Sequence, residues 1–374
     1  MRIRTAAVGA LCVAAALLTA CSTAAEPEPR SAPKNGDAAP LTGRAGAAGK
    51  QSMPVPHGKG SRLPFDFNGD GNRDLVLNDL VKAPGDSLGD DAGIGIVYGT
   101  AGPRTLDPAV RQLLTPRTHA TEVEGVLPAA FDAEASCDLD QDGFADLVVT
   151  TDPPYDGIGR PPVPLQLLFG SPAGLTGKAV VLRIPGQARY GNDWPDHPVC
   201  GDFDGDGSPD LALTASAGRV SFLRGPFTRA GAPRAATAPL PGGGPALAAP
   251  EAAADTNGDG ADDLVALPRT HTPGTAAKGK LLLGGPTGPG RPGGGYAYAA
   301  VKVPPAPALG IGGGEKKPVT DVLAYADFDG DKRPDMVTRT HQGERADIVA
   351  VHPARPASPR TPPLITFSTS LFLP

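Results

Sequence analysis

The sequence predicts an all-β protein, a β-propeller made of four-stranded blades. Three observations support this class: an aspartate-rich stretch of nine residues occurs five times, short β-rich runs follow each copy, and the 374 residues include 50 glycines and 44 prolines. Long helices exclude glycine and proline, whereas turn-rich β proteins use both. Five repeats are detectable, and six or seven blades stay open if some units are degenerate.

The spacing of the stretches sets the size of the repeating unit. Their first aspartates are 72, 64, 53 and 72 residues apart, too long for a helical hairpin and suitable for a four-stranded sheet. Such a sheet cannot bury both of its faces alone. Several sheets packed face to face around an axis would bury them, which is the arrangement of a propeller.

Each stretch has the chemistry of a calcium loop. In the best copy, Asp202 to Asp210, side-chain oxygens at positions 1, 3, 5 and 9 and the main-chain carbonyl of position 7 could surround a hard cation. Glycine at position 6 allows the sharp turn, because it takes positive φ without steric cost. Position 12 is Leu213, not the bidentate glutamate of a helix-loop-helix calcium site, so the aspartate at position 9 must close the loop.

The five predicted loops share this ligand pattern. Loop 1 contains Asp66, Asn68, Asp70, Asn72 and Asp74; loop 2 Asp138, Asp140, Asp142, Phe144 and Asp146; loop 3 Asp202, Asp204, Asp206, Ser208 and Asp210; loop 4 Asp255, Asn257, Asp259, Ala261 and Asp263; loop 5 Asp327, Asp329, Asp331, Arg333 and Asp335. In loop 5, Lys332 stands where the other loops have glycine. Backbone strain and the added positive charge predict that this site is the weakest.

The strand signals fall in a regular order around each loop. An apolar stretch leads into the loop, a short β-rich run leaves it, and a third run follows a turn. The third runs are Gly95–Gly99, Leu165–Gly170, Arg219–Leu223, Lys280–Gly284 and Asp347–Val351. A weaker fourth run closes each unit, as in Ala179–Ile184 and Pro363–Phe367.

The N-terminal part has the layout of a secreted lipoprotein. A basic start and the apolar run from Ala6 to Ala20 predict a signal peptide over residues 1–20. Leu18-Thr19-Ala20-Cys21 resembles the bacterial lipobox, which implies cleavage before Cys21 and lipidation of its thiol; an ordinary cleavage site beside a chance cysteine is the alternative. Residues 21–56 are rich in Ala, Pro and Gly without apolar periodicity, so we expect a disordered tether. Residues 57–374 then form the propeller, held outside the cytoplasm at the outer face of a bacterial cell membrane.

Two cysteines remain in the part of the chain expected to fold. Cys137 and Cys200 each lie just before a calcium loop, in neighbouring repeats. An oxidising compartment would permit a disulfide, but two buried free thiols are equally compatible with the sequence.

In its aspartate loops and the strand runs around them, the sequence resembles the FG-GAP or VCBS repeat family, found in integrin α-subunit propellers and bacterial surface proteins. The resemblance rests on the five aspartate loops with their Leu-Val tails, the Ala83-Pro84 step, and the pairs Tyr98-Gly99 and Phe169-Gly170. It implies that the calcium ions, about four or five per chain, are structural.

Two classes of function stay open. The first is a binding or adhesion module for a protein or glycan, and the second is an extracytoplasmic lyase or hydrolase acting on polysaccharide. His-Glu-x-x-His and Cys-x-x-Cys motifs are absent, which favours the first class, and no catalytic residue is predicted. Trp194 and His197, in a polar loop, are candidate ligand contacts. A sequence pI near 5.5 without a basic cluster argues against nucleic acid as a partner.

Overall fold

The computed structural model describes most of the C-terminal nine-tenths of the chain. The described residues are 52–373 except 84, 87–89, 102–105, 155–164, 193–194, 252, 305–316, 344 and 355–361. All described residues belong to the second of the two units into which the chain divides, Gly43–Pro374. The predicted signal peptide, the lipidation site Cys21 and nearly all of the predicted tether therefore lie outside the described residues, as does Trp194.

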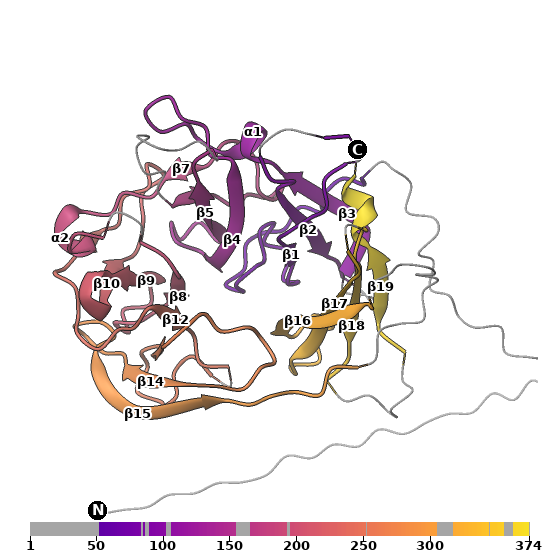
Figure 1. Ribbon diagram of the computed structural model, residues 1–374. Coiled ribbons are helices and arrows are strands. Elements are labelled where there is room, and N and C mark those ends of the chain that lie inside the picture. The colour runs from indigo at the N-terminus through magenta and orange to yellow at the C-terminus, as the bar shows by residue number, and fades with distance from the viewer. Residues whose placement is uncertain are drawn as a thin grey trace, which may run out of the picture. The chain divides into compact units, whose positions relative to one another are not determined.

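Five antiparallel sheets follow one another along the chain and are arranged as the blades of a propeller (Figure 1). Blade 1 contains β1 (Leu75–Leu77), β2 (Ile94–Gly99) and β3 (Leu106–Leu114). Blade 2 contains β4 (Ala130–Cys137), β5 (Asp146–Asp152), β6 (Gln166–Leu168) and β7 (Val180–Val181). Blade 3 contains β8 (Val199–Gly201), β9 (Asp210–Ala215), β10 (Arg219–Arg224) and β11 (Ala235–Ala236). Blade 4 contains β12 (Ala246–Ala248), β13 (Leu264–Leu267), β14 (Ala277–Leu283) and β15 (Arg291–Tyr298), and blade 5 contains β16 (Val319–Ala326), β17 (Asp335–His341), β18 (Ile348–His352) and β19 (Ile365–Ser368).

Helical structure is minor among the described residues. It consists of α1 (Pro116–His119), α2 (Gly186–Arg189) and the 3₁₀ turns η1 (Ser216–Gly218) and η2 (Thr369–Phe372). No helix within the described ranges is long and apolar enough to cross a bilayer. The predicted all-β class and the five repeating units are confirmed.

Apolar side chains pack between neighbouring blades, as the repeat argument requires. Phe67 of loop 1 lies in one core with Leu147 and Leu168 of blade 2. A second core joins blades 2 and 3, and a third joins blades 3 and 4. Leu75 of blade 1 packs with Val337 of blade 5, so the last sheet closes against the first.

Blade 1 has three strands among the described residues, where the repeat pattern predicts four. The segment before loop 1 contains Pro54, Pro56 and Pro64, and proline cannot donate to a strand ladder. Instead of pairing with β1, this segment crosses to the neighbouring blade. The N–H of Ser61 donates to the carbonyl of Gly143 in loop 2 at 2.7 Å.

The predicted strand Ala179–Ile184 is shortened to β7, Val180–Val181. Its backbone leaves the sheet early, because the N–H of Arg183 donates to the carbonyl of Gly231 in blade 3 at 2.8 Å.

A disulfide joins the innermost strands of blades 2 and 3. It links Cys137 of β4 to Cys200 of β8, with the two Cα atoms 6.0 Å apart. Of the two arrangements that the sequence left open, the structure contains the paired one.

Candidate metal centres

All five predicted loops adopt the same bend. The carboxylate at position 1 accepts hydrogen bonds from backbone N–H groups further along its own loop. In loop 3, Asp202 accepts from Asp206 at 3.0 Å and from Gly207 at 2.8 Å. The bond from position 6 recurs in the other loops, donated by Gly71, Gly143, Gly260 and Lys332.

Position 6 has left-handed backbone in each loop. Its φ is 86° at Gly207 and 66° at Lys332. The lysine therefore follows the bend that glycine makes elsewhere, at a steric cost of about 1 kcal/mol that glycine does not incur.

The aspartate at position 9 is buried and fastens the loop to its own blade. In loop 2, Asp146 accepts a 2.9 Å hydrogen bond from the N–H of Leu139 at position 2 and another of 2.9 Å from Gly170, which follows β6. Burial, partly offset by these bonds, raises the pKa of Asp146 to about 8. The same two-sided bonding occurs at Asp74, Asp210, Asp263 and Asp335.

The residue after the third strand must be small for this bond to form. A Cβ on Gly170 would collide with the carbonyl oxygen of Ala145, at position 8 of the loop. Gly225 has the same relation to Pro209 in blade 3. Gly225 is not among the predicted residues, because it is preceded by Arg224, whereas Gly170 is preceded by the aromatic Phe169. A glycine at the end of the third β-rich run is the sequence signal that identifies this position.

Position 2 connects loops 2 and 3 to the next blade. The carbonyl of Leu139 accepts from Phe227 of blade 3 at 2.7 Å, and the carbonyl of Phe203 accepts from Gly285 of blade 4 at 2.9 Å. If such a loop becomes disordered, the contacts of two blades are therefore affected.

The loops bring acidic side chains close enough to share one cation. The ligand oxygens of Asp138, Asp140 and Asp146 lie within 4.8 Å of one another, as do those of Asp202, Asp204 and Asp206 and those of Asp327, Asp329 and Asp335. Loops 1 and 4 have asparagine at position 3 and so hold fewer carboxylates.

Position 3 provides the clearest indication of a ligand. Asn68 is fully buried, its Nδ2 donates to the carbonyl of Pro56 at 2.8 Å, and its Oδ1 has no hydrogen-bond partner. The side chain of Asp140 in loop 2 is 6% exposed, and its Oδ1 is buried and also has no partner. Buried oxygens without partners are costly, and both belong to position 3, a predicted cation ligand.

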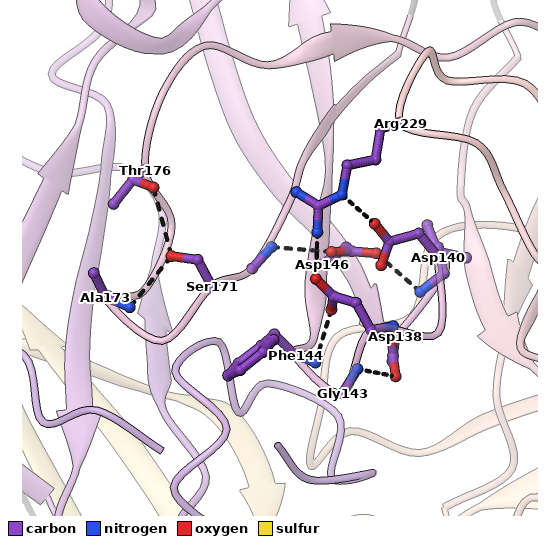
Figure 2. A network of polar contacts seen from close by, with 12 residues as sticks. Asp138, Asp140, Gly143, Phe144, Asp146, Ser171, Ala173, Thr176 and Arg229 are labelled. Carbon is purple, nitrogen blue, oxygen red and sulfur yellow. Dashed lines mark hydrogen bonds and ion pairs between the residues drawn. The ribbon is translucent and has the colours of Figure 1, made fainter. Parts of the chain in front are cut away.

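Arginine side chains lie against several of the acidic loops (Figure 2 shows loop 2). Arg229 contacts Asp140 and Asp142, Arg224 lies 3.3 Å from Asp204, and Arg291 lies 3.1 Å from Asp259. Arg234 contacts Asp206. These contacts depend on the fold, so the loop pattern in the sequence does not predict them.

A cavity of about 1160 Å³ runs along the inner strands of blades 2 to 4. Its wall includes His197, whose Nε2 lies 2.8 Å from Thr270 Oγ1, and Glu134 of β4. Glu134 occupies a β-bulge, since Ala133 and Ala135 pair with adjacent residues of β5. Glu134 is exposed to the solvent of the cavity, but the surrounding protein partly desolvates its carboxyl group, and together with the nearby Asp196 carboxylate this raises the pKa of Glu134 to about 7.

Fold and loops together define a five-bladed propeller with a repeated aspartate loop. Residues 202–266, which span loop 3 and loop 4, match the family model described as FG-GAP-like repeat. The match includes two of the five aspartate loops on which the resemblance rests. No curated protein gives a match to the chain.

Proposed function

We propose that the protein is a calcium-binding propeller whose ions hold the aspartate loops in place. The observation that supports this best is the pair of buried, unpartnered oxygens at position 3, Asn68 Oδ1 and Asp140 Oδ1. Calcium takes oxygen ligands from carboxylates, amides and main-chain carbonyls, which is the donor set of these loops. The ion would also neutralise carboxylates that now repel one another, so its binding energy would stabilise the fold.

Counting bound calcium tests this proposal. Purified protein dialysed against calcium should retain about four or five ions per chain. Asp140→Ala should retain one ion fewer, whereas Asp152→Ala, which removes an exposed aspartate at the end of β5, should retain them all. A wild-type protein that retains no calcium would contradict the proposal.

We further propose that the mature protein is held at the outer face of the cell membrane through a lipid on Cys21. The support is the sequence Leu18-Thr19-Ala20-Cys21 after a signal-like apolar run. Wild-type protein should partition into detergent, and Cys21→Ser should be soluble or retained unprocessed. Equal partitioning of the two forms would contradict lipidation.

On this scaffold we propose a binding or adhesion role toward a protein or glycan. The support is the cavity whose wall includes His197, the candidate contact residue that lies within the described ranges. Binding of the purified protein to panels of polysaccharides and extracellular proteins tests the role. His197→Ala should weaken a ligand found in this way, and His352→Ala, on β18 outside the cavity lining, is the control.

A polysaccharide lyase or hydrolase is the second candidate, favoured by Glu134. A carboxyl group with a pKa of about 7, placed in a cavity by a β-bulge, has the properties of a general acid or base. Asp132 on the same strand also has a raised pKa, about 6, through burial and neighbouring carboxylates. Release of reducing or unsaturated ends from a bound polysaccharide, lost in Glu134→Gln but not in Glu122→Gln, would establish this function.

The stretch Gly85-Asp86-Ser87-Leu88-Gly89 matches the Gly-x-Ser-x-Gly pattern of a hydrolase nucleophile in its letters. That motif functions on a strand-turn-helix elbow. Here the next element described is the strand β2, and residues 87–89 lie outside the described part of the chain. The stretch therefore does not support the enzymatic candidate.

A further inference from the structure

Arg229 belongs to blade 3 but contacts the acidic loop of blade 2. It follows Phe227, whose N–H donates to the carbonyl of Leu139 in loop 2 at 2.7 Å. This backbone bond brings the arginine over loop 2, where its guanidinium lies 5.1 Å from the centre of the Phe169 ring. The side chain is thus placed by a backbone hydrogen bond and a cation–π contact, neither of which involves a carboxylate.

The guanidinium bridges two of the predicted calcium ligands. Arg229 Nε lies 2.7 Å from Asp140 Oδ2, and its Nη2 contacts Asp142 Oδ2 (Figure 2). The other oxygen of Asp142 accepts from the N–H of Phe144 at 3.1 Å. The other oxygen of Asp140 is buried and unpartnered, so the arginine satisfies one side of that carboxylate and leaves the opposite side available.

We propose that Arg229 is a built-in counter-ion that keeps loop 2 ordered when calcium is absent. The loop holds four carboxylates, and without a cation their mutual repulsion disfavours the folded loop. The arginine offsets part of this repulsion from the neighbouring blade. When calcium binds, the ion supplies the positive charge, and the arginine is needed less. Arg229 therefore lowers the dependence of the blade 2–blade 3 interface on calcium.

This inference rests on the proposed calcium function, and it concerns the stability of the protein when calcium is absent. Loops 3 and 4 have related contacts from their own blades, through Arg234 on Asp206 and Arg291 on Asp259. Arg229 differs because its loop and its backbone belong to different blades. Loss of this arginine should therefore affect the packing of both.

Thermal unfolding of purified full-length protein in calcium and in EGTA tests the proposal. Arg229→Gln should lower the melting temperature more in EGTA than in calcium. The calcium-induced rise, which is the melting temperature in calcium minus that in EGTA, should therefore exceed that of the wild type by about 2 °C. Arg219→Gln is a matched control in the same blade, because Arg219 also lies over an aromatic ring, that of Tyr190 at 4.9 Å, and donates to a carbonyl, that of Pro239. It should leave the calcium-induced rise unchanged.

A charge-preserving variant tests whether charge is the cause. Arg229→Lys should show the wild-type rise, and the effect of Arg229→Gln should disappear when Asp140→Asn is also present. The proposal is overturned if Arg229→Gln leaves the rise equal to or smaller than that of wild type, or if Arg229→Lys widens it as much as Arg229→Gln. A wild-type protein that shows no rise at all would refute the calcium function itself, which separates that failure from failure of the counter-ion role.

Discussion

Asp146 accepts a 2.9 Å hydrogen bond from the backbone N–H of Gly170, so the last ligand position of loop 2 is tied to the end of β6. The same bond joins Asp74 to Gly99, Asp210 to Gly225 and Asp263 to Gly284. Blades 1 to 4 therefore each contain a fixed link between the loop and the end of the strand that pairs with the strand leaving the loop. Cation binding at the loop would act on the sheet through this link.

Gly170→Ala should destabilise the protein by about 1–3 kcal/mol, the cost of leaving a buried acceptor unpaired. The added methyl group would meet the carbonyl of Ala145 and push the N–H of residue 170 away from Asp146. Gly186→Ala is the control, because a Cβ there meets no atom. Urea unfolding of both variants measures the difference, and equal stability of the two would show that the close approach is not needed.

Lys332→Gly should stabilise the protein by about 1 kcal/mol by removing a side chain from left-handed backbone. The reciprocal change, Gly207→Lys, should impose a similar cost on loop 3. Both are measured by urea unfolding in calcium. If Lys332→Gly does not stabilise the protein, or Gly207→Lys does not destabilise it, the bend at position 6 is not shared between these loops.

The regular features of this chain were predictable because each is encoded locally. The nine-residue loops specify their own turns, and the spacing between them specifies a four-stranded unit. Third strands such as β2 and β10 also lie within a residue of their predicted bounds. Local patterns repeat in the sequence wherever the structure repeats.

The remaining features depend on contacts between distant residues. Arg229 and Asp142 are 87 positions apart, and no pattern at either residue indicates the other. Among the described residues blade 1 has no inner strand, because the segment before loop 1 contains prolines and bonds to the neighbouring blade instead. The bulge at Glu134 arises from the pairing of β4 with β5, which a single strand does not reveal.

Glu134 should make stability fall as the pH rises. Its pKa is raised to about 7 in the folded protein from an ordinary value near 4.5, so the folded state favours the protonated form. The stability this contributes is complete below pH of about 4.5 and is lost as the pH passes through about 7. Glu134→Gln should therefore gain stability relative to wild type between these values. The urea midpoints of wild type and Glu134→Gln across this pH range measure the gain, with Glu122→Gln as control. A gain that does not depend on pH would contradict the raised pKa of Glu134.

The disulfide should contribute up to about 4 kcal/mol, because it closes a long loop between blades 2 and 3. The linked residues are 63 positions apart. The variant with Cys137→Ser and Cys200→Ser should unfold at lower temperature than wild type under oxidising conditions. Added reductant should lower the melting temperature of wild type and leave the variant unchanged. Equal melting of the two proteins before reduction would show that the bond is absent or without effect.

We propose that the aspartate loops stabilise the propeller by binding calcium, and one comparison of variants tests this directly. Asp206→Ala and Asp331→Ala each remove position 5 of a loop, and Lys332 should already weaken the second site. In calcium, Asp206→Ala should lower the melting temperature more than Asp331→Ala, and in EGTA the difference should shrink while the wild type itself melts earlier. If wild type melts at the same temperature in both conditions and the two variants cost the same in each, the loops are turns held by their own hydrogen bonds, and the metal account is wrong.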